Sequence, residues 1–437
     1  MAPTLPRLTS PLNIAVIGGG WAGMAAAVHA TQAGHKVSVF EAARTLGGRA
    51  RAMRATLPDK TAVQLDNGQH ILIGAYSETL ALMQLVGVDT DRALLRIPLT
   101  LLFPDNMGIR LPRWPAPLDA LAGILGARGW NAGDKFSLLR VSARWQLAGF
   151  QCAPSVTVAG LCTGISPRVM DELIEPLCVS ALNIPAARAS GQVFLRVIRD
   201  SLFAGSGGSN LLLPRVDLSA LFPLAAAQWL ATRGCTVETG RRVESLSCGS
   251  QDASRWHVDG QTFDSVIIAC PPWDAARLIS SAGIDVATWL NLANGLQYEA
   301  ITTVYATSQA RLAHPMLSLR SSPTEPAQFV FDRGQLGGPA GLLAFVVSAS
   351  HGERDILQQQ VIAQGQGLGF ANLQPLQTVV EKRATFACTP GLQRPPIKVA
   401  PGLLACGDYV EGPYPATLEG AVRSAAMAVK CLAPLQK

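Results

Sequence analysis

Charged residues are scarce in this chain, and no apolar stretch is long. Only 15% of the 437 residues are charged, against about 25% in ordinary globular proteins, whereas 49% are hydrophobic. No uninterrupted apolar run reaches the roughly 18 residues of a membrane-spanning helix. The excess hydrophobicity therefore predicts a large apolar cavity, a surface that rests on a membrane, or both. The length allows two or three domains.

Metal-ligating and hydrolytic patterns are also missing. The nine cysteines form no C-x-x-C pair, and none of the six histidines stands at zinc-ligand spacing. A G-x-S-x-G nucleophile motif is absent as well. We expect reduced thiols, no metal and a cytoplasmic protein, because the N-terminal segment lacks the apolar core of a secretory signal.

The net charge of +6 is modest, and the arginines are scattered along the chain. This distribution argues against nucleic-acid binding and favours weak attraction to anionic lipid. We therefore expect peripheral contact with the inner face of the cytoplasmic membrane.

A glycine-rich turn near the start carries the first positive signal. Asn13–Ile17 has the pattern of a short buried parallel strand, and Gly18, Gly20 and Gly23 fit G-x-G-x-x-G. The first glycine allows a tight turn, the second allows a pyrophosphate to approach, and the third allows close packing of helix and strand. The helix that starts near Trp21 would direct unpaired N–H groups at the phosphates.

The following segment completes a nucleotide-binding unit. Small residues, Ala22 among them, give the helix a slim face, and Gly34 ends it. A second strand ends at Glu41, 18 residues after Gly23, where a carboxylate can accept hydrogen bonds from ribose hydroxyls. The order and spacing of strand, glycine turn, helix and acid therefore predict a cofactor that contains adenosine.

The chain after Glu41 extends the site. Ala42 and Arg44 lead to Gly47-Gly48-Arg49, where paired glycines allow the backbone close to a second pyrophosphate oxygen. Arg44 or Arg49 would add positive charge. A surface turn with solvated arginines is the alternative interpretation.

Three dispersed segments carry a family resemblance. Glu41 with Leu46–Arg49 resembles the FAD-binding signature of the flavin amine oxidase and phytoene desaturase superfamily. Gly407-Asp408-Tyr409 resembles its second flavin motif, and a helix with Thr417 and Leu418 at its start would point toward the flavin. Val243, on an expected short strand, resembles the residue whose backbone meets the adenine. The resemblance implies FAD and an α/β fold with two dinucleotide-binding domains.

Further phrases are similar to the squalene-associated FAD-dependent desaturase family, whose characterised activity is hydroxysqualene dehydroxylation in hopanoid biosynthesis. They span nearly the whole chain: Leu65–His70, Glu175–Cys178, Ala181–Asn183, Leu212–Leu218 and Gly412–Ala421. The resemblance implies that reduced FAD converts hydroxysqualene to squalene with release of water.

Such chemistry needs a proton donor in a dry apolar site. The candidates are Asp66, His70, Tyr409, Glu411 and Tyr414, all on segments expected near the flavin. Asp66 has the alternative role of a turn residue, His70 that of a structural histidine, and the tyrosines that of packing residues. No single acid stands out.

The segments divide into two expected domains. An FAD-binding domain comprises residues 12–84, 215–274 and 396–435, and an inserted α+β substrate-binding domain comprises 85–214 and 275–395. Helices are expected near 135–147 and 168–181, and strands at 301–306, 328–331, 342–348 and 382–387. The apolar stretch 94–125 is either a lid or a membrane contact, and its prolines argue against a clean helix.

Two other functions stay open. An isoprenoid desaturase would use the same flavin in the opposite redox direction. A flavin-stabilised binding protein would hand over isoprenoids without reacting with them.

Overall fold

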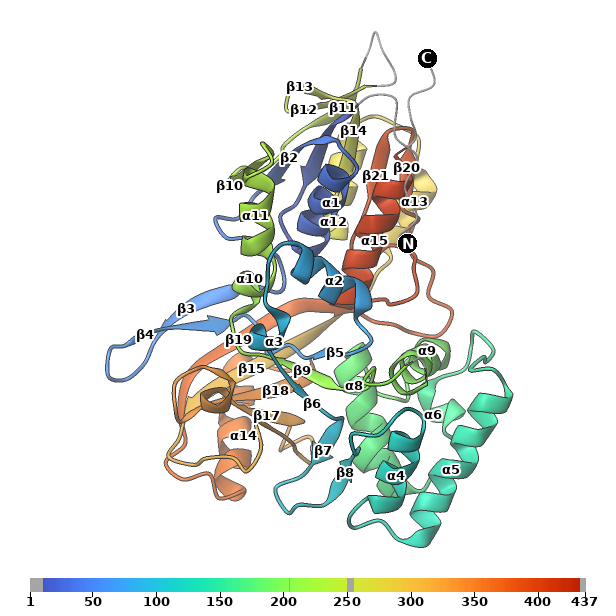
Figure 1. Cartoon of the computed structure of the whole chain (residues 1–437), viewed down its shortest axis with the longest axis vertical. Coiled ribbons are helices and arrows are strands. Elements are labelled where there is room, and N and C mark those ends of the chain that lie inside the picture. Colours follow the sequence, from blue (N-terminus) through green and yellow to red (C-terminus); the bar gives the residue numbers. More distant parts are fainter. Residues whose placement is uncertain (1–10, 204, 250–254, 433–437) are drawn as a thin grey trace.

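A computed structural model describes residues 11–203, 205–249 and 255–432 of the chain. A six-stranded sheet with its helices forms one end of the elongated molecule, and a five-stranded sheet with a lobe of helices forms the other (Figure 1). The N- and C-terminal parts of the chain both belong to the first end. The expected α/β architecture with an inserted α+β part is confirmed.

The six-stranded sheet has the order β10-β2-β1-β14-β21-β20. Its first five strands are parallel, and β20 pairs antiparallel with β21. The central strand is buried on both faces, as its apolar sequence requires. The strands are β1 (Asn13–Ile17), β2 (Lys36–Glu41), β10 (Thr236–Thr239), β14 (Ser265–Ile268), β20 (Lys398–Ala400) and β21 (Leu403–Ala405).

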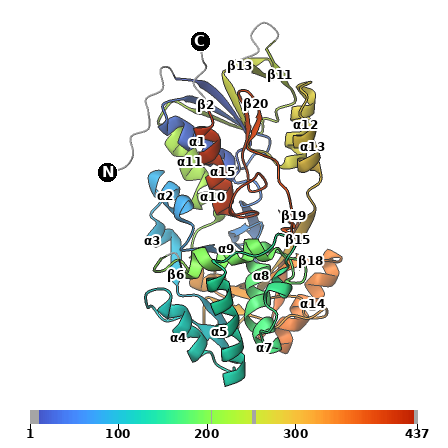
Figure 2. The ribbon, with the colours of Figure 1, turned by 90° about the vertical axis from the view of Figure 1, so that its right-hand side faces the viewer.

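Helices cover both faces of this sheet. Figure 2 shows α1 (Trp21–Gln32), α11 (Pro223–Ala231) and α15 (Leu418–Lys430) on one side, with α12 (Pro272–Ser281) and α13 (Ala287–Asn294) on the other. Ala25, Ala26 and Ala27 of α1 are fully buried, so their small side chains let the helix lie close to the sheet and to α15. A small antiparallel sheet adjoins this end: β11 (Leu246–Cys248), β12 (Trp256–Val258) and β13 (Gln261–Phe263).

Short elements join the two ends of the molecule. Strand β9 (Leu211–Pro214) pairs with both β5 (Leu72–Ile73) and β6 (Leu94–Ile97). Two hairpins flank it, β3–β4 (Ala52–Thr56, Ala62–Asp66) and β7–β8 (Thr100–Leu102, Gly108–Arg110). The connecting helices are α2 (Ser77–Leu85), α3 (Thr90–Ala93) and α10 (Leu218–Leu221).

The five-stranded antiparallel sheet has the order β16-β17-β18-β15-β19. Its residues alternate between two cores: Val304 packs in the core under α14 (Arg354–Gly367), whereas Tyr305 belongs to the main core. Four of its strands confirm the four predicted ones: β15 (Tyr298–Thr307), β17 (Phe329–Asp332), β18 (Leu342–Ser350) and β19 (Gln374–Phe386). The fifth, β16 (Met316–Ser318), was not predicted. A 3-10 turn, Arg333–Leu336, follows β17.

The helical lobe confirms both predicted helical stretches. Its elements are α4 (Leu118–Gly126), α5 (Ala132–Leu147), α6 (Val158–Leu161), α7 (Pro167–Val169), a π-helical turn (Met170–Ile174), α8 (Glu175–Leu182) and α9 (Gly191–Leu202). The expectation that prolines prevent a helix within 94–125 is wrong for α4, because Pro117 directly precedes its first residue and interrupts no helical hydrogen bond. Among the residues described, no helix is both long and apolar enough to cross a bilayer.

Candidate functional site

A cavity of about 970 Å³ lies where the two ends of the molecule meet. Segments far apart in the sequence line it: 17–51, 67–76, residue 99, 177–211, 241–278, 301–348, 381–385 and 407–421. Of the residues predicted to bind cofactor, all but Gly23 and Arg44 are on its wall. Of the predicted acids, His70, Tyr409 and Tyr414 are on it, and Asp66 and Glu411 are not.

The glycine turn shapes one wall. Gly18 has φ +116°, and a Cβ there would come within 2.8 Å of the backbone of Ala269. A Cβ on Gly23 would lie 1.8 Å from the carbonyl oxygen of Gly18, so this glycine serves helix–strand packing. A Cβ on Gly20 would meet nothing nearer than 3.7 Å. The lack of a Cβ at Gly20 therefore leaves room in the cavity and does not serve to avoid a clash.

The N-terminus of α1 faces the cavity as an anion site. Gly20 provides no side-chain cap, and no acidic residue occupies the first turn. Trp21 and Ala22 line the cavity at the start of the helix, where backbone N–H groups have no intrahelical partner. Trp21 is held in place because its indole N–H donates to the carbonyl of Ala50 at 3.1 Å.

Glu41 connects the glycine turn to the following segment. Its carboxylate accepts hydrogen bonds from the N–H groups of Gly19 at 2.5 Å and Ala43 at 2.7 Å. The N–H of Gly47, where φ is +114°, donates to the Gly19 carbonyl at 3.0 Å. Ala42, Gly47 and Gly48 are thereby held along the cavity beside the glycine turn.

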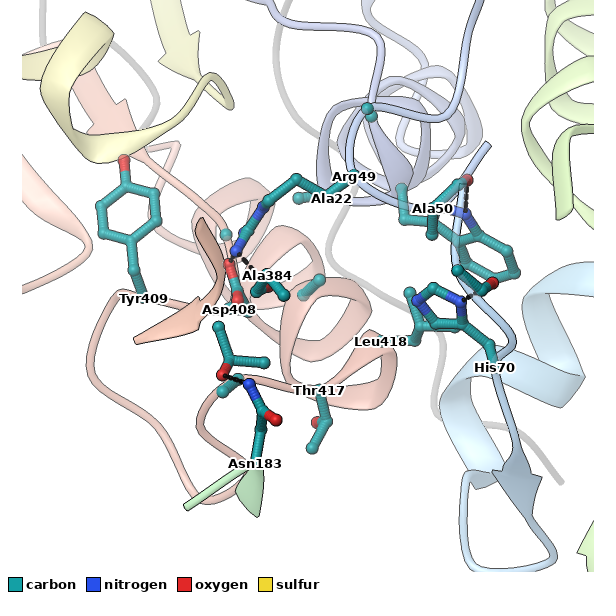
Figure 3. Close-up of a pocket in the computed structure, with 18 of the residues that line it drawn as sticks. Ala22, Arg49, Ala50, His70, Asn183, Ala384, Asp408, Tyr409, Thr417 and Leu418 are labelled. Atoms are coloured by element: carbon teal, nitrogen blue, oxygen red, sulfur yellow. Dashed lines mark hydrogen bonds and ion pairs between the residues drawn. The ribbon is translucent and has the colours of Figure 1, made fainter. Parts of the chain in front are cut away.

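An ion pair joins the two predicted flavin motifs. Arg49 contacts Asp408 and donates a second hydrogen bond to the carbonyl of Ala384 at 3.0 Å (Figure 3). Burial opposes the charge on Arg49, but Asp408 outweighs it and raises the pKa of the guanidinium. The charge of Arg49 is therefore partly neutralised by Asp408, and Arg49 is not an entirely free cation for a phosphate. Gly407 precedes the pair, also on the cavity wall.

The positive charge expected from Arg44 or Arg49 comes from Arg49 and from three further arginines. Arg44 is exposed and does not line the cavity, whereas Arg241, Arg242 and Arg277 do. Arg277 donates to the carbonyl of Val243 at 3.0 Å and holds that segment in place. Val243 lines the cavity as expected, but the predicted strand around it is wrong: it lies in the irregular segment between β10 and β11.

A second helix N-terminus faces the cavity. Thr417 caps α15 by accepting the Gly420 N–H at 2.9 Å, and Leu418 is the first helical residue. Beneath them Glu419 is fully buried, and it accepts hydrogen bonds from Thr79 and Arg423. These contacts fix the start of α15 against α2.

The other part of the cavity is apolar. Its walls come from the five-stranded sheet below and from α8 and α9 above, as the lining residues Phe329, Phe331, Val346, Leu177, Phe194 and Ile198 show. Asn183, at the end of α8, ties these walls together: its amide donates to Thr385 Oγ1 at 3.0 Å and its oxygen accepts the Ala349 N–H at 2.6 Å. Figure 3 shows the Asn183 contact at the cavity.

His70 is a poor proton donor. Its Nδ1 lies 2.9 Å from the carbonyl oxygen of Gly68, and because a carbonyl only accepts, Nδ1 carries the hydrogen. Burial lowers the pKa of the ring, so His70 is neutral near pH 7. Its Nε2 is then a hydrogen-bond acceptor.

Tyr414 forms a polar pair that the sequence did not reveal. Its hydroxyl donates to Asp200 Oδ2 at 2.6 Å, from the loop before α15 to helix α9. Burial and this bond raise the pKa of Tyr414 to about 12. Arg199 contacts the other carboxylate oxygen of Asp200 at 2.8 Å. Both Tyr414 and Asp200 line the cavity.

The three remaining candidates have other positions. Asp66 is buried behind the cavity, where it accepts the N–H of Leu218 at 2.8 Å and anchors α10. Burial raises the pKa of Asp66 to about 7. Glu411 is exposed, on a small separate pocket. Tyr409 is buried with its ring against Trp289, and Figure 3 shows its hydroxyl pointing away from Thr417 and His70.

These residues fit a dinucleotide. Two helix N-termini, the open space beside Gly20 and three arginines suit a diphosphate, and Glu41 suits a ribose.

Fold and site together define a flavin-dependent oxidoreductase. The chain belongs to the family of flavin containing amine oxidoreductases, whose model matches residues 21–433. It is similar to the hydroxysqualene dehydroxylase of Rhodopseudomonas palustris, with 28% identity over 94% of this chain and 96% of that protein. A more distant relative is the 15-cis-phytoene desaturase of Capsicum annuum, with 23% identity over 98% of this chain and 78% of that protein.

Solved structures agree on the fold. The cyclohexylamine oxidase of Brevibacterium oxydans matches with a TM-score of 0.67 and 14% identity, covering 97% of this chain and 99% of that one.

Proposed function

We propose that this chain binds FAD and reduces hydroxysqualene to squalene with loss of water. The observation that carries the proposal is one cavity lined partly by the glycine turns and helix N-termini and partly by apolar side chains. Similarity to a hydroxysqualene dehydroxylase along 94% of the chain supports the substrate. We further propose that residues 85–214 and 275–395 form the substrate-binding domain and that the protein works at the inner face of the cytoplasmic membrane.

The FAD would lie along the first and last segments of the chain. The N–H groups of α1 and the neighbouring arginines would hold its diphosphate, Glu41 its ribose, and the start of α15 its ring. Reduced FAD, when bound, supplies a hydride. The apolar walls from α8, α9 and the five-stranded sheet exclude water, which protects an allylic cation from capture.

Tyr414, positioned by Asp200, is the proposed proton source for the departing hydroxyl. The phenol, held 2.6 Å from Asp200, would donate its proton to the substrate oxygen and take one back from solvent after the turnover. The carbon–oxygen bond breaks to give water, and the hydride then fills the vacant position on carbon. One proton from solvent and one hydride balance the reaction.

An anaerobic single turnover tests the proposal. Photoreduced enzyme mixed with hydroxysqualene should form squalene as the flavin absorbance near its oxidised maximum returns. No product under these conditions would refute the reaction.

Tyr414→Phe tests the proton source. It should lower the rate of that turnover by about 100-fold, the usual worth of general acid catalysis, while flavin content stays unchanged. Tyr76→Phe is the matched control: it removes another partly buried phenol from the cavity wall, so its rate should stay close to that of the wild type. Equal rates in Tyr414→Phe and the wild type would exclude Tyr414 as the donor.

An isoprenoid desaturase is the second candidate, supported by the similarity to a phytoene desaturase. In that case oxidised enzyme mixed with a more saturated isoprenoid should bleach the flavin. A binding protein, the third possibility, would retain the isoprenoid without any change in flavin absorbance.

A further inference from the structure

Helices α4 and α5 lie at the end of the molecule remote from the six-stranded sheet (Figures 1 and 2). These helices and the segment just before α4 expose large apolar side chains. Trp114 is 57% exposed, Leu125 54% and Phe136 66%. Leu118 and Leu121 are exposed on the same helix as Leu125. We call these five residues the apolar surface. Single exposed apolar side chains are ordinary, but a group confined to one lobe marks an interaction site.

Four residues of the apolar surface lie on neighbouring helices. Leu118, Leu121 and Leu125 follow the i, i+3, i+7 spacing of one helical face. Lys135 Nζ donates to the Leu125 carbonyl at 2.7 Å, which places the start of α5, and with it Phe136, beside the end of α4.

The exposed charges within the segment that carries this surface have one sign, although acids flank it: Asp105, which is paired with Arg320, and Asp171. Residues 106–170, all described, contain two acids and seven basic residues: Arg110, Arg113, Arg128, Lys135, Arg140, Arg144 and Arg168. Both acids are buried, and each carboxylate accepts a hydrogen bond from a backbone N–H group. Asp119 accepts from the N–H of Ala120, and Asp134 accepts from the N–H of Asn131 at the start of α5. Water therefore meets cations and apolar groups here but no carboxylate of this segment.

We propose that this surface docks on a bilayer of anionic lipid. Apolar side chains can enter the boundary between headgroups and acyl chains while the arginines meet the phosphates. A second copy of this chain fits poorly, because two such surfaces would bring seven basic residues against seven. The proposal does not depend on the reaction, since binding to lipid is measured without turnover.

The surface is also close to the cavity. Leu99 lines the cavity, and its carbonyl accepts the N–H of Leu111 at 2.9 Å. The side chain of Leu111 in turn packs on Gly123 of α4, where a Cβ would approach it to 2.8 Å. Only helix α4 and the paired segments that carry Leu111 and Leu99 therefore lie between the apolar surface and the cavity wall, which suits a protein whose substrate dissolves in lipid.

Vesicle flotation tests the docking. The FAD-loaded full chain should float with vesicles of equal phosphatidylglycerol and phosphatidylcholine, and much less with phosphatidylcholine alone. Leu121→Ser combined with Leu125→Ser should weaken partition at least about tenfold. Ile356→Ser on α14, at a position 55% exposed, is the matched control and should bind as the wild type does.

A charge reversal separates the two contributions. Arg110→Glu with Arg113→Glu should weaken partition at least about tenfold at low salt, and by less at high salt. Arg311→Glu, an exposed arginine outside the lobe, should change little.

Equal flotation of wild type and both double variants would overturn the proposal. Sedimentation of the protein without vesicles tests whether a second copy of the chain occupies this surface instead. If the wild type is a dimer, the Leu121→Ser, Leu125→Ser variant is a monomer and flotation is unchanged, the surface is a protein interface.

Discussion

At the dinucleotide end of the cavity the wall is largely main chain, whereas at the apolar end it is largely side chain. Glycines, helix N-termini and hydrogen bonds between neighbouring backbone segments shape the first. Phenylalanines and leucines from the five-stranded sheet, α8 and α9 shape the second. A wall made of main chain therefore tolerates no added side-chain atoms. A wall made of side chains depends instead on the few polar contacts that hold its helices and strands together.

The dinucleotide end should fail when a single side chain is added. Gly20→Val should fold, because a Cβ there clashes with nothing, but it should fill the space beside the N-terminus of α1. We expect flavin affinity to fall by about 100-fold or more. Titration of apoprotein with FAD, followed by fluorescence quenching, measures this. Gly126→Ala, at an open helical glycine, is the control, and normal affinity in Gly20→Val would contradict the backbone interpretation.

The apolar end should fail when a polar contact is removed. Asn183→Ala loses the contacts to Thr385 and Ala349 and places alanine at φ +51°. We expect a loss of about 3 kcal/mol in the free energy of unfolding, measured by denaturant titration. Asn183→Gly relieves the backbone strain alone, so it should recover only about 1 kcal/mol. Full stability in the alanine variant would show that packing alone holds this end.

A buried acid at the dinucleotide end gives the smallest effect. The pKa of Asp66 is raised to about 7, so the folded protein holds a proton that the unfolded chain releases above about pH 4. Stability should therefore fall as pH rises from 5 to 7, by about 2 kcal/mol.

Asp66→Asn keeps an acceptor for Leu218 and should remove this slope. Thermal unfolding of both proteins across that pH range measures the difference. Parallel curves would mean that Asp66 is ionised throughout.

Sequence predicted the dinucleotide end well because its signals are local. Between residues 13 and 41 the strand, the glycine turn, the helix and Glu41 are consecutive in the sequence. The backbone geometry there requires each of these residue types. The positions of the acids depend on tertiary packing instead. Glu411 faces outward because Arg394 donates to the carbonyls of Val410 and Gly412 and holds the loop away from the cavity.

The partner of Tyr414 could not be predicted for the same reason. Asp200 is 214 residues away and reaches the tyrosine only because α9 crosses the cavity. Likewise, Arg277 is at the cavity because α12 follows β14, and no spacing distinguishes it from Arg44 in the sequence.

The contact between Arg49 and Asp408 has a consequence for biosynthesis. The two residues are separated by 359 positions, so the nascent chain can complete this part of the cavity wall only after residue 408 has left the ribosome. Until α15 arrives, the first βαβ unit carries a glycine turn with its helix N-terminus uncovered. Loading with cofactor would then wait for the segment around Asp408, and the cofactor supply would decide how much of the newly made chain reaches the finished state.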